Sequence, residues 1–204
     1  MDRTTYTLLR SPKADVGATV CHTAAQNLDI IPANIDRSAA EVQLVNEVAR
    51  ESALARVLRH VEADYDVILI DCQPSLGLLA VNALTAAHGV IVPVEAEFFA
   101  LRGVALLVET IETVRDRINP RLKIDGIVAT MVDSRTLHSR EVLQRLQEAF
   151  GDLVFDTRIG RTIQFPDASV ATDPTPSYAP PPARAHAYHP QAHDDLPPDD
   201  AASP

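Results

Sequence analysis

The strongest chemical signal in the sequence is the run DYDVILIDCQPS at residues 64–75. Its four consecutive aliphatic residues, 67–70, predict a strand that is buried on both faces of a parallel sheet and that ends at the carboxylate of Asp71. Open α/β sheets bind ligands beyond the carboxyl ends of their strands, and phosphate-loop nucleotidases keep there the acidic residue that orients the shell of a Mg²⁺ ion. The turn Gln73-Pro74-Ser75 that follows is placed to sense a γ-phosphate. Because many strands simply end in aspartate, the run by itself indicates nucleotide chemistry without establishing it.

The same region contains the residue types of a hydrolase triad, Ser75, His88 and Asp71. No Gly-x-Ser-x-Gly elbow surrounds Ser75, so that a role as the N-cap of the next helix is the better interpretation. We interpret Cys72 as a small buried residue beside the turn and not as a nucleophile.

A second candidate for acid–base chemistry is the pair Glu95 and Glu97. Two residues apart at a strand end, they face the same side, but a glycosidase pair needs a partner carboxyl group on another element. A structural or switch-linked role is therefore the better interpretation of both glutamates.

The elements that must position these residues alternate along residues 1–172. Apolar runs predict strands at Leu28–Ile31, Val67–Ile70, Gly89–Val94, Ile124–Met131 and Leu153–Phe155. Helix-period patterns lie at Ser38–Val61 (with a break near Arg50), at Leu101–Ile118 and at Ser139–Phe150, which Gly151 ends. This alternation predicts an α/β fold with a mostly parallel sheet flanked by helices.

The composition changes near Asp173. Residues 173–204 hold nine of the 15 prolines, with clustered aspartates and almost no large aliphatic side chains. Such a segment buries too little apolar surface to offset the entropy of ordering, so we predict a disordered C-terminal tail at 173–204 after a domain at 1–172.

Composition and charge exclude several classes of protein. A net charge of −10 argues against coating nucleic acid by bulk charge, and 4% aromatic residues without tryptophan argue against a stacking platform for single strands. Two cysteines cannot by themselves form a disulfide framework or a four-ligand zinc site. No apolar run approaches the roughly 18 residues of a membrane span, and the N-terminus lacks a secretion signal. We expect a cytoplasmic chain without a membrane partner.

Four segments in order resemble the ParA/Soj family of chromosome- and plasmid-partitioning ATPases. They are LDIIPANID, the long run that begins DYDVILIDCQPSLGLLAVNALTAAHGVIVPVEAEFFALRG, INPRLKIDGIVATMVDSRT and VFDTRIGRTIQFPDAS. The resemblance covers about residues 4–180 and implies a phosphate-loop NTPase fold like that of ParA and MinD. It further implies ATP and Mg²⁺ as cofactors, an ATP-dependent homodimer that binds double-stranded DNA without sequence preference at the nucleoid, and a ParB-type protein that stimulates hydrolysis.

The resemblance also implies roles for particular residues. Asp71 matches the Walker B aspartate, which holds Mg²⁺ through water, and Met131 and Asp133 match a segment beside the nucleotide base. Arg135 and Arg161 match arginines on the DNA-facing surface of the family. Gly160 replaces the usual proline before Arg161, which loosens that loop. The switch II stretch that contacts the nucleotide matches Cys72, Gln73, Pro74 and Ser75.

One motif of the family has no counterpart in the sequence. The family's glycine-rich loop contains Gly-Lys-Thr, whereas the lysines here, Lys13 and Lys123, lie outside any such loop. We therefore expect an incomplete domain that does not hydrolyse ATP alone, with unpaired backbone where the loop's central strand belongs. A non-enzymatic interaction fragment is the first alternative. A MinD-like cell-division ATPase is the second, disfavoured because the tail contains no amphipathic membrane helix.

Overall fold

A computed structural model describes residues 4–10, 15–33, 44, 47–73, 75–97, 100–133 and 135–161. Its contacts divide the chain into two units, the first formed by residues 1–88 and 109–123, the second by residues 89–108 and 124–204. The predicted tail at 173–204 lies outside the described residues, as do residues 38–43, 45 and 46 of the predicted helix at Ser38–Val61.

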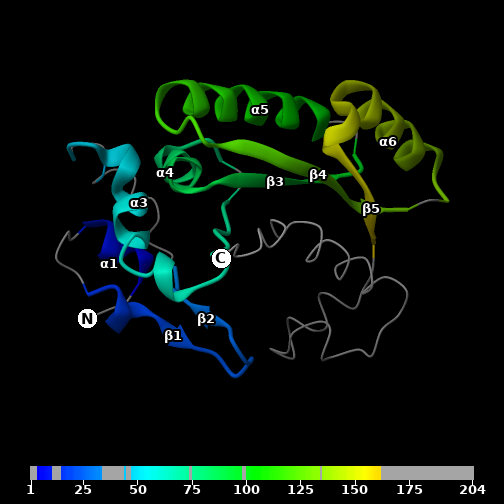
Figure 1. The fold of residues 1–204 in the computed structure, drawn as a ribbon. Helices are drawn as coiled ribbons and strands as arrows, with labels where there is room; N and C mark the ends of the chain where they lie inside the picture. The colour runs from blue at the N-terminus through cyan, green and yellow to red at the C-terminus, as the bar shows by residue number, and fades with distance from the viewer. Residues whose placement is uncertain are drawn as a thin grey trace, which may run out of the picture. The chain divides into compact units, whose positions relative to one another are not determined.

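The second unit is built on a three-stranded parallel sheet with the order β3-β4-β5. Its strands are β3 (Gly89–Glu95), β4 (Lys123–Val132) and β5 (Val154–Gly160). The helices α5 (Ala100–Arg117) and α6 (Leu137–Phe150) lie along one face of this sheet (Figure 1). These elements confirm the predicted α/β class, and the three strands and two helices follow the predicted order.

The core of this unit lies between the sheet and its two helices. Ile127 of β4 is completely buried, and it packs with Val92 and Val94 of β3, Val104 of α5 and Leu146 of α6. On the other side of β3, Ile91 keeps 41% of its surface exposed. The strand β3 therefore alternates between buried and exposed residues in the described structure, whereas the sequence predicted burial on both faces.

Two glycines allow neighbouring strands to pack closely. A Cβ at Gly126 of β4 would lie 2.1 Å from the Cζ atom of Phe155 on β5, and one at Gly89 of β3 would overlap the carboxylate of Asp125. At the end of α6, Gly151 takes a positive φ of 54° and serves as the C-cap, as predicted.

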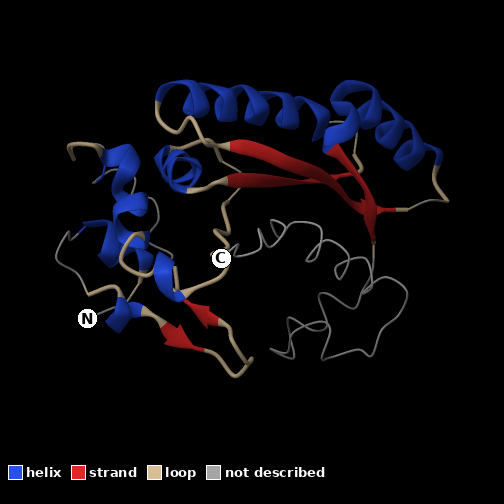
Figure 2. Ribbon diagram, in the orientation of Figure 1, coloured by secondary structure: helices blue, strands red, loops and turns tan. Residues whose placement is uncertain are grey.

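The first unit consists of short elements around an antiparallel hairpin. The hairpin pairs β1 (Cys21–His22) with β2 (Asp29–Ile30), as Figure 2 shows. The helices are α1 (Thr5–Arg10), α3 (Ala53–Leu58) and α4 (Leu78–Ala86), with single 3₁₀ turns at Gly17–Thr19, Arg50–Ser52 and Glu62–Asp64. The predicted break near Arg50 is confirmed, because Ala49 adopts a left-handed φ of 53° directly before the 3₁₀ turn.

Side-chain hydrogen bonds hold this unit together beside a small apolar cluster. Leu8, Val16, Val57 and Val61 form the buried cluster. The buried amide of Asn82 donates to the carbonyl oxygens of Arg50 and Leu78 and accepts from the backbone N–H of Leu54, which ties α4 to the segment around α3. The carboxylate of Asp29 accepts from the Tyr65 hydroxyl at 2.7 Å and contacts Nδ1 of His22 at 2.7 Å.

The prediction of a buried strand at Val67–Ile70 is wrong. These residues form no described strand, and Val67, Ile68 and Leu69 are 52%, 37% and 89% exposed. A strand exists only when a neighbouring strand supplies hydrogen-bond partners, and no described strand pairs with this run. Residues 67–70 therefore have high β propensity but no described strand with which to pair.

Candidate functional site

The Asp71 segment of the first unit leads from the exposed run at 67–70 toward α4. The carboxylate of Asp71 is exposed and has no hydrogen-bond or ion-pair partner among the described residues. In the turn that follows, the Gln73 side-chain amide donates to the Ser75 hydroxyl at 3.1 Å, and the Ser75 N–H donates to the Gln73 carbonyl at 2.7 Å. Pro74 lies outside the described residues. An exposed turn with an unpaired carboxylate is open to a ligand.

Two predictions in this segment are wrong. Ser75 is not the N-cap of α4, because that helix begins at Leu78 and its N-cap is Gly77, which has no side chain to accept a hydrogen bond. Cys72 is exposed and not buried, since no sheet forms around it. Desolvation of the sulfur and, after it, the negative charge of Asp71 raise the pKa of the Cys72 thiol. A raised pKa leaves less thiolate at neutral pH, and the interpretation that Cys72 is not a nucleophile stays a prediction.

A second group of predicted residues gathers in the other unit, where the three strands of the sheet end. The N–H of Arg161, just after β5, donates to the carbonyl of Val132 at the end of β4 (3.2 Å). The N–H of Arg135 donates to the Asp133 carboxylate at 3.1 Å. The backbones of both arginines are thus anchored to adjacent residues of one strand end. The structure brings Met131, Asp133, Arg135 and Arg161 to this sheet end, whereas Asp71, Cys72, Gln73 and Ser75 belong to the first unit.

Each of the two arginines is paired with a carboxylate. The guanidinium of Arg135 donates through Nε and Nη2 to the two oxygens of Asp133, at 2.9 and 2.8 Å. These hydrogen bonds from Arg135 to Asp133, together with the negative charge of the carboxylate, raise the pKa of Arg135 above its ordinary value. Arg161 lies 3.7 Å from Glu97, which follows β3. All four charges remain accessible to solvent, so that phosphate oxygens can compete for the guanidinium groups.

The pairing of these four residues was not predicted from the sequence. The Asp-Ser-Arg spacing was a usable signal for Asp133 and Arg135, because an aspartate in a turn regularly bonds the backbone two residues on. No local signal joins Glu97 to Arg161, since 64 positions separate them and only the strand order brings them together.

Met131 occupies a strained position at this sheet end. Its φ is +53°, a left-handed conformation that non-glycine residues rarely adopt, and the pairing of β4 with β5 shifts register between Ala129 and Val132. The side chain is 39% exposed. Strain of this kind is common where a backbone is shaped around a ligand, and the position of Met131 beside a nucleotide base stays a prediction.

The carboxylate of Asp71 fits the water-mediated part of a Mg²⁺ site, whereas the sequence contains no counterpart of the Gly-Lys-Thr loop that completes such a site. No group of three His, Cys, Asp or Glu side chains able to hold a metal occurs among the described residues, so a cage made of protein ligands is not present in that part of the chain. Mg²⁺ keeps several waters and takes one or two carboxylates together with substrate phosphates. The exposed, unpaired carboxylate of Asp71 fits this mode, with water between carboxylate and ion.

Comparisons with known proteins decide the family. The AAA domain family AAA_31 matches residues 1–124. The chain is 43% identical to the chromosome-partitioning ATPase Soj of Treponema pallidum over 185 residues, which cover 91% of this chain and 73% of Soj. The chain belongs to the ParA/Soj family. It is also 54% identical over 188 residues to an uncharacterised protein of Mycobacterium tuberculosis, covering 92% of this chain and 59% of that protein's length.

Solved structures agree with the fold. A cobyrinic acid a,c-diamide synthase from Mycobacterium smegmatis, with bound ADP and magnesium, is 41% identical and superposes with a TM-score of 0.71, covering 78% of this ParA/Soj-family chain and 64% of that one. Apo McdA from Cyanothece superposes with a TM-score of 0.84 at 16% identity, covering 94% of this chain and 77% of McdA. The P-loop NTPase fold of the ParA type is therefore confirmed. No helix in the described ranges is long and apolar enough to cross a membrane.

Proposed function

We propose that this chain serves in a ParA-type partition ATPase that moves chromosomes or plasmids. The observation that carries the proposal is the convergence of Arg135 and Arg161 at one end of the β3-β4-β5 sheet, where the family's DNA-facing arginines are expected. Two guanidinium groups lie at one sheet end of a chain whose net charge is −10, and phosphate oxygens reach them by displacing the carboxylates of Asp133 and Glu97. Such a site binds backbone phosphates and ignores base sequence.

On the nucleotide side, we assign Asp71 the water-mediated hold on Mg²⁺ and the turn with Cys72, Gln73, Pro74 and Ser75 the response to the γ-phosphate. Met131 and Asp133 are assigned to the nucleotide base. The M. smegmatis relative with bound ADP and magnesium supports ATP and Mg²⁺ as the cofactors. Phosphoryl transfer depends almost entirely on positioning and charge neutralisation, so the 204-residue chain, without a Gly-Lys-Thr loop, is expected to be inactive alone.

The proposed partners follow from the same family resemblance. ATP joins two copies into a homodimer, the dimer binds double-stranded DNA at the nucleoid in the cytoplasm, and a ParB-type protein stimulates hydrolysis. We place partition before diamide synthesis because the relative Soj is named for chromosome partitioning and the paired arginines suit a polyanion. A non-enzymatic interaction chain that retains only these surfaces is the second candidate.

Hydrolysis in a loop-bearing chimera tests the nucleotide assignment. The chimera places an N-terminal segment with the family's Gly-Lys-Thr loop before residue 4 of this chain. We expect Mg²⁺-dependent ATP turnover by the chimera and none by the 204-residue chain. Asp71→Asn should abolish turnover while nucleotide binding weakens less, because the residue holds the metal and not the nucleotide itself.

Asp66→Asn is the matched control, since Asp66 is an exposed aspartate at the start of the same run. It should leave turnover unchanged. Turnover by the 204-residue chain, or equal effects of the two substitutions, would contradict the assignment.

A further inference from the structure

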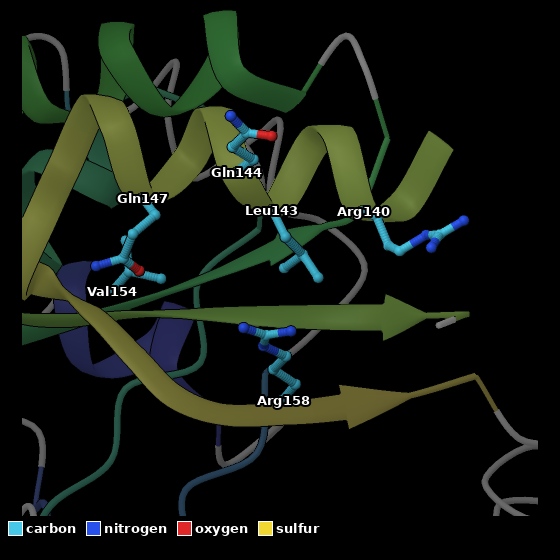
Figure 3. Close-up of a pocket in the computed structure, with 6 residues that line it drawn as sticks. All are labelled: Arg140, Leu143, Gln144, Gln147, Val154 and Arg158. Atoms are coloured by element: carbon cyan, nitrogen blue, oxygen red, sulfur yellow. The ribbon is translucent and has the colours of Figure 1, made fainter. Parts of the chain in front are cut away.

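A hollow lies between α6 and β5 in the second unit, apart from the residues assigned above. Its volume is about 350 Å³, and it is lined by Arg140, Leu143, Gln144, Gln147, Val154 and Arg158 (Figure 3). The half-buried side chains of Leu143 and Val154 supply its apolar part. Arg140 comes from the helix wall and Arg158 from the strand wall, with Leu143 between them.

The two arginines have no acidic partner in the described part of the chain. No ion pair or side-chain hydrogen bond joins Arg140 or Arg158 to another described residue, in contrast to Arg135 and Arg161. No acidic residue lines the hollow. Both arginines are exposed at the hollow, so an anion can approach their guanidinium groups from solvent.

The position of Arg140 is not explained by its own helix. Arg140 lies in the first turns of α6, where a cation opposes the helix dipole, and no acidic residue lies in the first turn to compensate for it. The residues three and four positions further on, Leu143 and Gln144, are uncharged and form no helical ion pair with it.

We propose that this hollow binds a phosphate group, with Arg140 and Arg158 as the ligands. Two guanidinium groups match the two negative charges of a phosphate, whereas a carboxylate carries only one. Each guanidinium can donate two parallel N–H bonds to phosphate oxygens. The remaining volume beside Leu143 and Val154 accommodates the group to which the phosphate is attached. A free phosphorylated molecule and a nucleic-acid backbone both supply such a phosphate, and the two sources are separated below.

Titration of the 204-residue chain with inorganic phosphate tests the proposal, with the arginine Nε–Hε signals followed by ¹H–¹⁵N NMR. We expect saturable shifts for Arg140 and Arg158. Arg102, an exposed arginine in the same unit that does not line the hollow, should drift linearly. Arg140→Gln and Arg158→Gln should each weaken phosphate binding by about 5-fold, the upper range for an exposed ion pair.

Arg102→Gln is the matched control, because it removes the same charge outside the hollow. Unchanged thermal unfolding of all three variants shows that the fold is intact. The proposal is supported if phosphate binding is saturable, if Arg140→Gln and Arg158→Gln weaken it, and if Arg102→Gln leaves it unchanged. Equal, non-saturating shifts of all arginines, or equal effects of the three substitutions, overturn the phosphate proposal. The aliphatic parts of Arg140 and Arg158 would then serve only to shield Leu143 and Val154 from water.

A second arm identifies the source of the phosphate. A random-sequence DNA duplex is added to the phosphate-loaded chain at low salt, where a few phosphate contacts suffice for binding. Displacement of phosphate from Arg140 and Arg158 assigns the site to backbone phosphates, and retention assigns it to a free phosphorylated molecule. Both results support a phosphate site. The inorganic phosphate titration does not depend on the ParA-type function proposed above. A negative result for the phosphate site therefore does not contradict that function, and a negative result for that function does not contradict the phosphate site.

Discussion

At the residue scale, the carboxylate of Asp133 accepts hydrogen bonds from Nε and Nη2 of Arg135. A contact of the same carboxylate with the nucleotide base is proposed in addition. A phosphate that approaches Arg135 must compete with this carboxylate. Asp133 is therefore expected to lower the affinity of the arginine for DNA.

Asp133→Asn should raise the DNA affinity of the loop-bearing chimera at saturating ATP. The expected gain is about 2- to 5-fold, because an exposed ion pair contributes up to roughly 1 kcal/mol. Fluorescence anisotropy with a labelled duplex measures it. Asp152→Asn removes the same charge from an exposed aspartate on the 3₁₀ turn Gly151–Leu153 and serves as control. An affinity that falls, or that rises equally in both variants, would show that Asp133 does not restrain Arg135.

The thiol of Cys72 offers a test of the Asp71 environment that needs no nucleotide. Desolvation and the charge of Asp71 raise its pKa, so the pH at which alkylation reaches half its maximal rate should exceed that of a free cysteine peptide. The measurement uses Cys21→Ser, which leaves Cys72 as the remaining cysteine. Adding Asp71→Asn removes a negative charge that disfavours the thiolate, so the midpoint should move to lower pH and alkylation at neutral pH should accelerate. An unmoved midpoint would place the Asp71 carboxylate away from the sulfur.

At the scale of elements, the sequence predicts those strands and helices that bury a face together. The strand predicted at Gly89–Val94 is β3, the helix predicted at Leu101–Ile118 is α5, and the helix predicted at Ser139–Phe150 is α6 with a start two residues earlier. The run at 67–70 has the same composition and forms no described strand, because strand formation depends on a neighbour and not on propensity alone. Sequence patterns record local preference and burial, whereas pairing is a long-range property.

Two glycines make a matched test of packing between elements. Gly126→Ala should destabilise the chain by about 1–3 kcal/mol, because the new Cβ would overlap the ring of Phe155 between β4 and β5. Gly103→Ala should stabilise it by roughly 0.5–1 kcal/mol, because Gly103 lies inside α5 and no atom lies within 4 Å of the position that its Cβ would take. Urea unfolding measures both. Equal effects, or a stable Gly126→Ala variant, would contradict the register of β4 against β5.

At the scale of the whole molecule, acidic composition and a DNA-facing role are compatible only if the basic residues gather locally. The family resemblance predicts that Arg135 and Arg161 face DNA, but no pattern within the sequence shows that both attach to the end of β4. That attachment depends on the parallel pairing of β4 with β5 and on the hydrogen bond from Arg161 to Val132. The hollow with Arg140 and Arg158 could not be predicted from the sequence either. It forms only when α6 and β5 pack together in the folded chain.

The measurement that tests the account most directly is the salt dependence of DNA binding by the loop-bearing chimera. Each arginine that contacts phosphate releases condensed counterions, so the affinity for a random-sequence duplex should fall steeply with salt and require ATP and Mg²⁺. Arg135→Ala and Arg161→Ala should each flatten the slope of log affinity against log salt by about one unit, and the 204-residue chain should bind little DNA at physiological salt. Tight binding by the 204-residue chain without nucleotide, or salt slopes of both variants equal to that of the parent chimera, would contradict the placement of the DNA surface at the β4–β5 end.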